Sequence, residues 1–328
     1  MGQLGEIAAA AELIYRHFGP TPTYCWPLIC ERAGTEVWVK HENHTPIGAF
    51  KARGGLVYLD DLMKRAPETR GVIAATRGNH GQSVAYAARR AGIEAVVVAP
   101  HGNSIEKNRA MRALGAELIE HGADFNAALD RAEELAVARG LHAFPSYHPL
   151  LVRGVATYGL ELLNAVPDLD TVYVPIGLGS GINGVISARD ALGLKTRVVG
   201  VVAAQAPAYA LSFEAGRTVS TESCDTLADG VSVRIPNAEA LEAMLKGAER
   251  VVTVSEDEIE AAMRAYYSDS HNLAEGAGAA ALAALLKEKE KMAGRKAAVI
   301  LSGGNVDTAL YRSVLAQAET RRAATSLA

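Results

Sequence analysis

Short apolar runs rich in valine and isoleucine alternate along the chain with longer segments of helical period. Some of these runs, such as Ala95–Ala99 and Ala297–Leu301, are apolar throughout instead of alternating with polar residues. Strands of this kind are typical of parallel sheets with helices on both faces, because neither face of such a strand meets water. The expected strands are Glu36–Lys40, Gly71–Ala75, Ala95–Ala99, Glu117–Glu120, Thr171–Ile176, Arg197–Val202, Val251–Val254 and Ala297–Leu301.

Helical segments separate most of these strands. The alternation predicts the α/β class, with two domains that are each a mostly parallel sheet flanked by helices. Residues 69–148 contain three or four strand–helix units of their own, so we expect a small domain there and a large domain from residues 1–68 and 149–328. The expected helices are Gln82–Ala91, Ser104–Leu114, Phe125–Arg139, Val152–Ala165, Ile182–Leu192, Glu256–Tyr267 and Gly278–Lys291, with a further helix-like run that ends at Met63.

Charge and cysteine content limit the classes of function to consider. The chain has 328 residues and a net charge of −4 without a long basic run, which argues against nucleic acid or an anionic membrane as partner. Glu6 and Glu12 interrupt the N-terminal segment, and no uncharged apolar run approaches membrane-spanning length, so neither a secretory signal nor a membrane helix is expected. Cys25, Cys30 and Cys224 show no metal-binding or redox spacing. We therefore expect a cytoplasmic protein.

One lysine, Lys51, stands directly after Phe50 and before the helix-like run. The positive end of the helix dipole disfavours an ammonium ion on the first turn, and burial has the same effect. A lysine in this place becomes a neutral amine more easily than an exposed one, and bond formation with an aldehyde requires a neutral amine. Most lysines are solvated charges, so this interpretation depends on the motifs that follow.

A glycine-rich turn, Pro175–Gly184, leads from an expected strand into a helix. Glycines let the backbone wrap closely around an anion with its N–H groups pointing inward, and the helix N-terminus adds a favourable dipole. The turn therefore predicts a phosphate site. The alternative is a tight strand-to-helix turn without a ligand, which does not require the four glycines present here.

The same turn contains the dinucleotide-binding spacing Gly179-x-Gly181-x-x-Gly184. A nicotinamide dinucleotide site also requires an acidic residue at the tip of the next strand, where it holds the ribose. The next strand leads instead to Gln205, and no carboxylate stands at its tip. The sequence therefore disfavours a dinucleotide.

Two further polar turns follow expected strands. The segment Thr76–Gln82 lies at the carboxyl end of a parallel strand, where α/β proteins bind ligands, so we expect a substrate-facing loop. His80 taken alone is more often a structural residue. The segment Leu301–Asn305 also closes a strand, and its Ser302 is an ordinary turn residue unless it acts together with the other motifs.

Together these motifs resemble the serine/threonine dehydratases of the second pyridoxal-phosphate fold group, the tryptophan synthase β-like family, which includes serine racemase and the 3-hydroxyaspartate dehydratases. The resemblance extends from about Thr21 to Asn305, with the motifs in family order and spacing. It implies a fold-type II enzyme with a large domain that binds pyridoxal 5′-phosphate and a small domain that carries the substrate loop. Less specific matches are Ala113–Glu117, Ala228–Gly230, Val252–Ser255 and Glu275–Ala279.

The resemblance also implies roles for individual residues. Lys51 matches the lysine that holds pyridoxal phosphate as an imine, and Phe50 matches the ring packed against the cofactor. Asn79 matches the group hydrogen-bonded to the phenolic oxygen, and Ser302 matches the partner of the pyridine nitrogen. The phosphate loop matches Gly177, Gly179, Ser180 and Gly181, and the expected contacts of the substrate carboxylate are Thr76, Asn79 and His80.

The expected partner of the pyridine nitrogen, Ser302, is a neutral hydroxyl group. It cannot stabilise a pyridinium as a carboxylate would, so prompt loss of a β-leaving group is favoured over a long-lived carbanion. The resemblance therefore implies β-elimination from a 3-hydroxy amino acid such as L-threonine or L-serine. The freed Lys51 amine removes the α-proton, the β-hydroxyl departs, and the enamine product hydrolyses to a 2-oxo acid and ammonia. Relatives are commonly dimers or tetramers, so we expect a homo-oligomer.

Arg77 departs from the family pattern. In the racemases a serine in this position protonates the opposite face of the α-carbon, whereas a guanidinium is a poor base, so little racemase activity is expected. Arginine binds carboxylates with two parallel hydrogen bonds. If Arg77 points into the site, it holds a second substrate carboxylate and favours 3-hydroxyaspartate or a related hydroxylated diamino acid. If it points outward, it faces solvent or holds the loop.

Other departures concern a metal, regulation and the shape of the pocket. Gln205 and Leu211 stand where metal-binding members of the family carry a glutamate and an aspartate, so no metal site is expected. The chain ends shortly after Asn305, so the regulatory domain of biosynthetic threonine dehydratases is not expected. The segment Thr45–Ala49 replaces the usual Thr-Gly-Ser run and is expected to alter the pocket.

Two other classes of function compete with β-elimination. β-Replacement, as in cysteine synthases, normally goes with a substrate loop different from the Gly-Asn-His-Gly run at residues 78–81. A ligand-binding protein without activity would not need Lys51, Ser302 and the phosphate loop together. The leading prediction is therefore a pyridoxal-phosphate-dependent ammonia-lyase that acts on a small amino acid.

Overall fold

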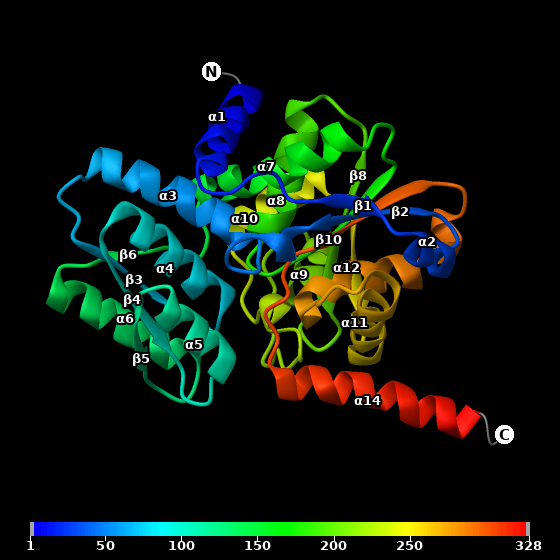
Figure 1. Ribbon diagram of the computed structural model, residues 1–328. Coiled ribbons are helices and arrows are strands. Elements are labelled where there is room, and N and C mark those ends of the chain that lie inside the picture. The colour runs from blue at the N-terminus through cyan, green and yellow to red at the C-terminus, as the bar shows by residue number, and fades with distance from the viewer. Residues whose placement is uncertain (1–2, 326–328) are drawn as a thin grey trace.

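In the computed structural model, which describes residues 3–325, the strands form two sheets (Figure 1). The larger sheet has the strand order β1-β2-β10-β7-β8-β9, and the edge strand β1 alone is antiparallel to its neighbour. Its strands are β1 (Thr23–Cys25), β2 (Glu36–His41), β7 (Thr171–Pro175), β8 (Arg197–Ala203), β9 (Arg250–Val254) and β10 (Lys296–Leu301).

The smaller sheet has four parallel strands in the order β5-β4-β3-β6. Its central strands are buried almost throughout, because their side chains pack into one hydrophobic cluster on each face of the sheet. The strands are β3 (Gly71–Ala75), β4 (Glu94–Ala99), β5 (Glu117–Glu120) and β6 (His142–Ala143). The prediction of an α/β fold with two mostly parallel sheets flanked by helices is confirmed.

Several of the helices that connect the strands begin at a residue whose side chain caps the helix, as α6 does. Helix α6 begins after Asp124, whose carboxylate accepts the N–H group of Ala127 at 2.9 Å, and ends at Gly140 in the left-handed conformation. The helices are α1 (Gln3–Tyr15), α2 (Pro27–Ala33), α3 (Lys51–Arg65), α4 (Asn79–Ala91), α5 (Ile105–Ala113), α6 (Phe125–Arg139), α7 (Pro149–Ala165), α8 (Ser180–Ala191), α9 (Ala208–Ala215), α10 (Ala238–Gly247), α11 (Glu256–Ser270), α12 (Gly276–Lys287), α13 (Lys289–Met292) and α14 (Thr308–Thr325), with the short 3-10 helices η1 (Glu42–His44) and η2 (Asp229–Val231).

Helix α3 runs from the middle of the molecule out over the half that holds the smaller sheet (Figure 1). It packs against α4, which covers the smaller sheet, and against α7, whose buried side chains share a hydrophobic cluster with strands of the larger sheet. Leu56, Leu59 and Leu62 of α3 join a buried cluster with Val72 of β3 and Val84 of α4. The first turn of α3 is therefore positioned by both halves of the molecule.

The structure differs from the prediction mainly in short and terminal elements, which are β1, β6, α1, α2, α9, α10 and α14. β1 and β6 have three and two residues, too few to show an alternating pattern. α2 and α9 have seven and eight residues, which is only about two helical turns. The expected helix Gly278–Lys291 begins earlier, at Gly276, and is interrupted at Glu288 to form α12 and α13.

The division into domains at residues 68 and 149 remains a prediction. All strands of the smaller sheet lie within residues 71–143, whereas α3, from the segment assigned to the large domain, shares its buried cluster with that sheet. None of the helices within residues 3–325 combines the length and the apolar character needed to cross a membrane.

Candidate active site

Lys51 is the first residue of α3, on the first helical turn as predicted. Its position is fixed from two sides. The Ser83 hydroxyl of α4 donates to the Lys51 carbonyl oxygen at 2.6 Å, and the N–H group of Phe50 donates to the Ser302 carbonyl oxygen at 3.0 Å. The lysine is thus held between a helix of the smaller sheet and the end of β10 in the larger sheet.

The unusual segment Thr45–Ala49 forms a tight loop before the lysine. The Thr45 hydroxyl accepts the Ala49 N–H group at 3.0 Å and donates to the Ala49 carbonyl oxygen at 2.7 Å. Gly48 has φ +66°, and a Cβ atom there would lie 2.7 Å from the Oδ1 atom of Asn305. The loop therefore packs directly against the turn that follows β10.

The Lys51 amine has an unusually low pKa. Burial lowers this pKa to about 8, and the negative charge of Glu275 opposes the shift without cancelling it. The Nζ atom lies 5.2 Å from the centroid of the Phe50 ring. Near pH 8 about half of the amine is neutral, and the neutral form is the nucleophile and the base.

The predicted phosphate loop, Gly177–Gly181, connects β7 to α8. Gly179 has φ +101°, and a Cβ atom there would lie 2.8 Å from the Cβ atom of Ala240. Ser180 and Gly181 are the first residues of α8, so their N–H groups have no acceptor within the helix. The loop presents backbone N–H groups and the positive end of a helix dipole, which together suit an anion.

Tyr158 of α7 joins the phosphate loop to the lysine segment. Its hydroxyl donates to the Gly181 carbonyl oxygen at 3.0 Å, and its ring packs edge-on against Phe50 with the ring centroids 6.1 Å apart. β7 and β10 are parallel neighbours, so the loop after β7 and the buried Ser302 after β10 lie at the same edge of the sheet. The structure thus brings the lysine, the glycine loop and the serine together.

Thr76 and Arg77, on the turn after β3, have different surroundings. Thr76 is buried, and its hydroxyl oxygen accepts the N–H groups of Gly78 at 3.0 Å and Gly81 at 3.3 Å, so it shapes the turn. The Arg77 side chain is exposed and, among the side chains that the structure describes, has no hydrogen-bond or ion-pair partner. Arg77 therefore lies at the surface of the turn.

Asn79 and His80 belong to the first turn of α4, so the predicted loop up to Gln82 is wrong at its end. The N–H group of Gln82 donates to the Gly78 carbonyl oxygen at 3.1 Å and closes this turn. The first turn of a helix carries free N–H groups and tolerates polar side chains. A prediction based on apolar periodicity therefore misses a helix start that is polar, as it is here.

The side chains of Asn79 and His80 are set in the interior of the site. The Asn79 amide donates to the Oε1 atom of Glu275 at 2.7 Å and accepts a hydrogen bond from Asn305 at 2.8 Å. The Nε2 atom of His80 is buried without a partner among the described residues. Burial is the larger cause, and the positive charge of Lys51 the smaller, of a His80 pKa lowered to about 3. The imidazole is therefore neutral at pH 7.

Glu275 is a site residue whose role the sequence analysis did not identify. It is buried at the start of α12, and burial raises its pKa against the opposing charge of Lys107, whose Nζ atom lies 4.0 Å away. Lys107 of α5 also pairs with Asp229 at 2.9 Å. The ionic group of Lys107, Asp229 and Glu275 therefore connects a helix beside the smaller sheet to segments beside the larger one. A sequence signal existed, because Glu275 is a single acidic residue before the uncharged segment 276–286.

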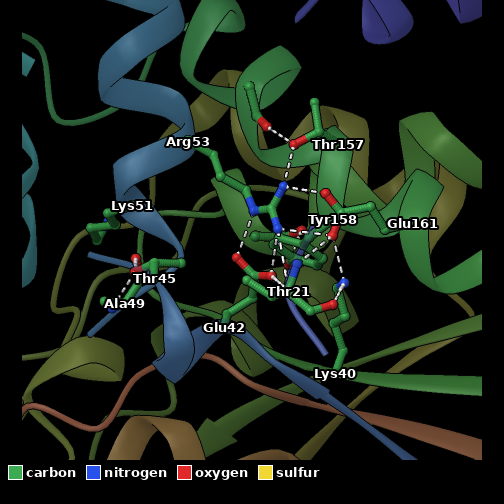
Figure 2. Close-up of polar contacts among 12 residues, drawn as sticks. Thr21, Lys40, Glu42, Thr45, Ala49, Lys51, Arg53, Thr157, Tyr158 and Glu161 are labelled. Carbon is green, nitrogen blue, oxygen red and sulfur yellow. Dashed lines mark hydrogen bonds and ion pairs between the residues drawn. The ribbon is translucent and has the colours of Figure 1, made fainter. Parts of the chain in front are cut away.

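Arg53, two residues after Lys51, is the centre of a buried ionic cluster that the sequence analysis also missed (Figure 2). Its guanidinium donates to Glu42 at 2.7 and 2.9 Å and to Glu161 at 2.6 and 2.9 Å. Glu161 also pairs with the Lys40 amine at 2.5 Å, so two cations balance two carboxylates. Figure 2 shows the Lys51 side chain pointing away from this cluster, which therefore supports the helix that carries the lysine.

A lysine amine with a lowered pKa, linked through Phe50 and Tyr158 to an anion-binding loop, suits a phosphorylated aldehyde. Comparison with known proteins agrees. The family model of pyridoxal-phosphate dependent enzymes matches residues 14–303, and the chain belongs to this family. It is 35% identical to the catabolic L-threonine dehydratase of Escherichia coli (strain K12), over 90% of this chain and 89% of that protein.

Solved structures show the same similarity. The processed form of threonine deaminase isoform 2 from Solanum lycopersicum has a TM-score of 0.89 at 30% identity, covering 95% of this chain and 91% of that one. A pyridoxal 5′-phosphate-dependent aspartate racemase has a TM-score of 0.87 at 29% identity, covering 92% of this chain and 95% of that one. The predicted family and cofactor are confirmed.

The residues of the site fit pyridoxal phosphate. The start of α8 offers N–H groups to a phosphate, and a side chain at Gly179 would clash with Ala240 where the loop turns. The pKa of Lys51 leaves a neutral amine for the aldehyde. The roles of single residues remain predictions. Within residues 3–325 no group of three or more histidine, cysteine, aspartate or glutamate side chains could hold a metal ion.

Proposed function

We propose that this protein is a pyridoxal-phosphate-dependent ammonia-lyase that eliminates the β-hydroxyl group of a 3-hydroxy amino acid, such as L-threonine or L-serine. The products are a 2-oxo acid and ammonia. The proposal depends most directly on the Lys51 amine, whose pKa of about 8 makes it a base near neutral pH. The similarity to an L-threonine dehydratase and to a threonine deaminase supports the substrate class.

Lys51 is the base in this proposal. When bound, pyridoxal phosphate withdraws electrons from the α-carbon of the substrate and makes its proton acidic. The neutral Nζ atom of Lys51 accepts that proton. The hydrogen bonds that Ser83 and Ser302 make to residues 50 and 51 fix the backbone that carries the amine, so that proton transfer needs little reorganisation.

The first turn of α4 positions the substrate carboxylate. The proposed contacts come from Thr76, Asn79 and His80, and the positive end of the α4 dipole favours an anion there. His80 is neutral and therefore holds the substrate without supplying a proton. Arg77 is a permanent cation, so this turn provides no second base for racemisation.

The proposal assigns the remaining predicted residues to the cofactor. Phe50 packs against it, Asn79 binds its phenolic oxygen, and Ser302 binds its pyridine nitrogen. The phosphate is assigned to Gly177, Gly179, Ser180 and Gly181. We further propose the large and small domains with boundaries at residues 68 and 149, a homo-oligomer, and a cytoplasmic location.

A second candidate substrate is 3-hydroxyaspartate, which requires the Arg77 side chain, exposed in the structure, to turn into the site when the substrate binds. A guanidinium that has no partner among the described side chains can bind a second carboxylate with two parallel hydrogen bonds. The solved neighbour named aspartate racemase acts on an amino acid with two carboxylates. In this case Arg77 contributes to substrate binding and not to the chemical step.

Formation of 2-oxo acid from L-threonine, L-serine and both diastereomers of 3-hydroxyaspartate tests these proposals. Wild type is expected to convert at least one of these substrates, and Lys51→Ala to convert none. Arg77→Ala is expected to leave turnover of threonine and serine unchanged. A Lys51→Ala variant that binds the cofactor and turns over substrate like wild type would overturn the proposed function.

The Arg77 variant separates the two substrates. Selective loss of 3-hydroxyaspartate turnover in Arg77→Ala supports the second candidate, and turnover confined to threonine and unchanged in this variant excludes it. Arg16→Ala is the matched control, because Arg16 is also exposed but lies beyond the end of α1. Appreciable inversion of serine by wild type would contradict the expectation of little racemase activity.

A further inference from the structure

Two of the three cysteines are in contact in the fold. The Sγ atoms of Cys25 and Cys30 lie 3.3 Å apart, and both residues are partly exposed. The sequence showed no redox spacing because four residues separate them. The contact arises because the chain turns from strand β1 into helix α2 between them. Cys224 is absent from this contact and provides an internal comparison.

The two sulfur atoms differ in how firmly they are held. Cys30 lies within α2, and its Sγ atom accepts the N–H group of Val37 at 3.3 Å. Cys25 is the last residue of the three-residue edge strand β1, which pairs on one side with β2. A disulfide bond is about 2.05 Å long, so the sulfur atoms need to approach by about 1.2 Å. The edge strand is the element able to make this movement.

We propose that Cys25 and Cys30 form a modification site that peroxide or a small disulfide converts to an intramolecular disulfide. With hydrogen peroxide, each thiol loses one hydrogen, the sulfur–sulfur bond forms, the oxygen–oxygen bond breaks and two water molecules result. With oxidised glutathione, one thiolate attacks the sulfur–sulfur bond of glutathione, forms a mixed disulfide and releases one reduced glutathione. The other thiolate then attacks the mixed disulfide, forms the intramolecular disulfide and releases the second reduced glutathione.

The reaction is slow at neutral pH and faster in base. Burial, together with the hydrogen bond to Cys30, raises the pKa of the Cys25 thiol to about 11. The thiolate is the attacking form in both reactions, so its supply from Cys25 increases as the pH rises. Oxidation is therefore expected to accelerate between pH 7 and pH 9.

Both tryptophans of the chain are next to this site. Trp26 directly follows Cys25, and Trp38 is the partner of Cys25 in the register of β1 and β2. The Trp26 indole donates to the Nε2 atom of His41 at 2.9 Å. Disulfides quench indole fluorescence, so the intrinsic fluorescence is expected to fall on oxidation and to recover on reduction.

Peptide mapping of the oxidised holoenzyme tests the proposal directly. Trypsin releases residues 17–32 as one peptide, which contains Cys25 and Cys30, and a different peptide contains Cys224. After treatment with peroxide or oxidised glutathione and alkylation, the peptide 17–32 is expected to lack the mass of two hydrogen atoms and to carry no alkyl group. The peptide of Cys224 is expected to be alkylated.

Matched variants distinguish this disulfide from other oxidation products. Cys25→Ser and Cys30→Ser are expected to abolish the reversible fluorescence change, and Cys224→Ser to preserve it. Full alkylation of the peptide 17–32 after oxidation would overturn the proposal. Cross-links between chains, or separate oxidation of the two thiols to sulfinic acids, would overturn it as well. The peptide map of the oxidised wild-type protein tests the disulfide even where a variant fails to fold.

Discussion

Replacement of Arg53 by methionine tests whether charge holds the cluster behind the lysine segment together. The change keeps an unbranched side chain but removes the guanidinium, so Glu42 and Glu161 stay buried with Lys40 as the remaining cation of the cluster. Breaking a buried ion pair costs about 3–5 kcal/mol, because it leaves a charge without compensation. We expect Arg53→Met to lower the free energy of unfolding by about this amount.

A second replacement is expected to restore part of the loss. In Arg53→Met with Glu42→Gln, the remaining charges of the cluster are Lys40 and Glu161, which pair with each other. The double variant should therefore be more stable than the sum of the two single effects predicts. For residues in direct contact, this coupling is about 0.5–3 kcal/mol.

An exposed pair on the same helix provides the control. Arg65 pairs with Asp61 at 2.9 Å, and about half of each side chain is exposed, at 51% and 44%. Exposed ion pairs contribute only about 0.2–1 kcal/mol. Arg65→Met removes the same group from α3 and should cost correspondingly little.

Urea unfolding, monitored by circular dichroism, measures these differences in the free energy of unfolding. Wild type, the single variants and the double variant are compared at one protein concentration and with saturating cofactor, because both affect the apparent stability. Equal losses in Arg53→Met and Arg65→Met would refute the reasoning. Additive effects of Arg53→Met and Glu42→Gln would show that the two residues are not coupled.

Two further predictions concern the N-terminal part of α3. In Gly55→Ala, the new Cβ atom would lie 2.2 Å from the Oγ atom of Ser83, the group that holds the Lys51 carbonyl oxygen, so a loss of about 1–3 kcal/mol in unfolding free energy is expected. Gly19→Ala, with open space around it, is the control, and equal urea midpoints for the two variants would contradict the account. Since the pKa of Lys51 is about 8, the rate of cofactor capture by the apoenzyme should rise with pH through a midpoint near 8 and level off above it. A model amine in the same buffers corrects for titration of the cofactor, and a midpoint near 10.5 would disagree.

Much of the fold could be predicted because its strands are long apolar runs. β3 has the predicted bounds and β10 differs by one residue, because a buried parallel strand leaves a continuous signal in the sequence. β5 also has the predicted bounds, although it is a partly exposed edge strand. β6 leaves no such signal in the sequence, because it has only two residues and is defined by its pairing with β3. The start of α4 was missed because its first turn is polar.

The site could be predicted where its residues follow strands or begin helices. Lys51 and the phosphate loop do so, and the pattern around them is local. Arg53 and Glu161 are 108 positions apart, so no local pattern could pair them. The contact of Cys25 with Cys30 likewise depends on the turn into α2, which periodicity does not describe.

The central claim is that the Lys51 amine binds the cofactor covalently. Borohydride reduction of the holoenzyme, followed by peptide mapping, fixes and locates the bond between the cofactor and its lysine. The account predicts one adduct, on Lys51, and none in Lys51→Ala. An adduct on another lysine, or no adduct in a protein that retains the cofactor, would contradict it.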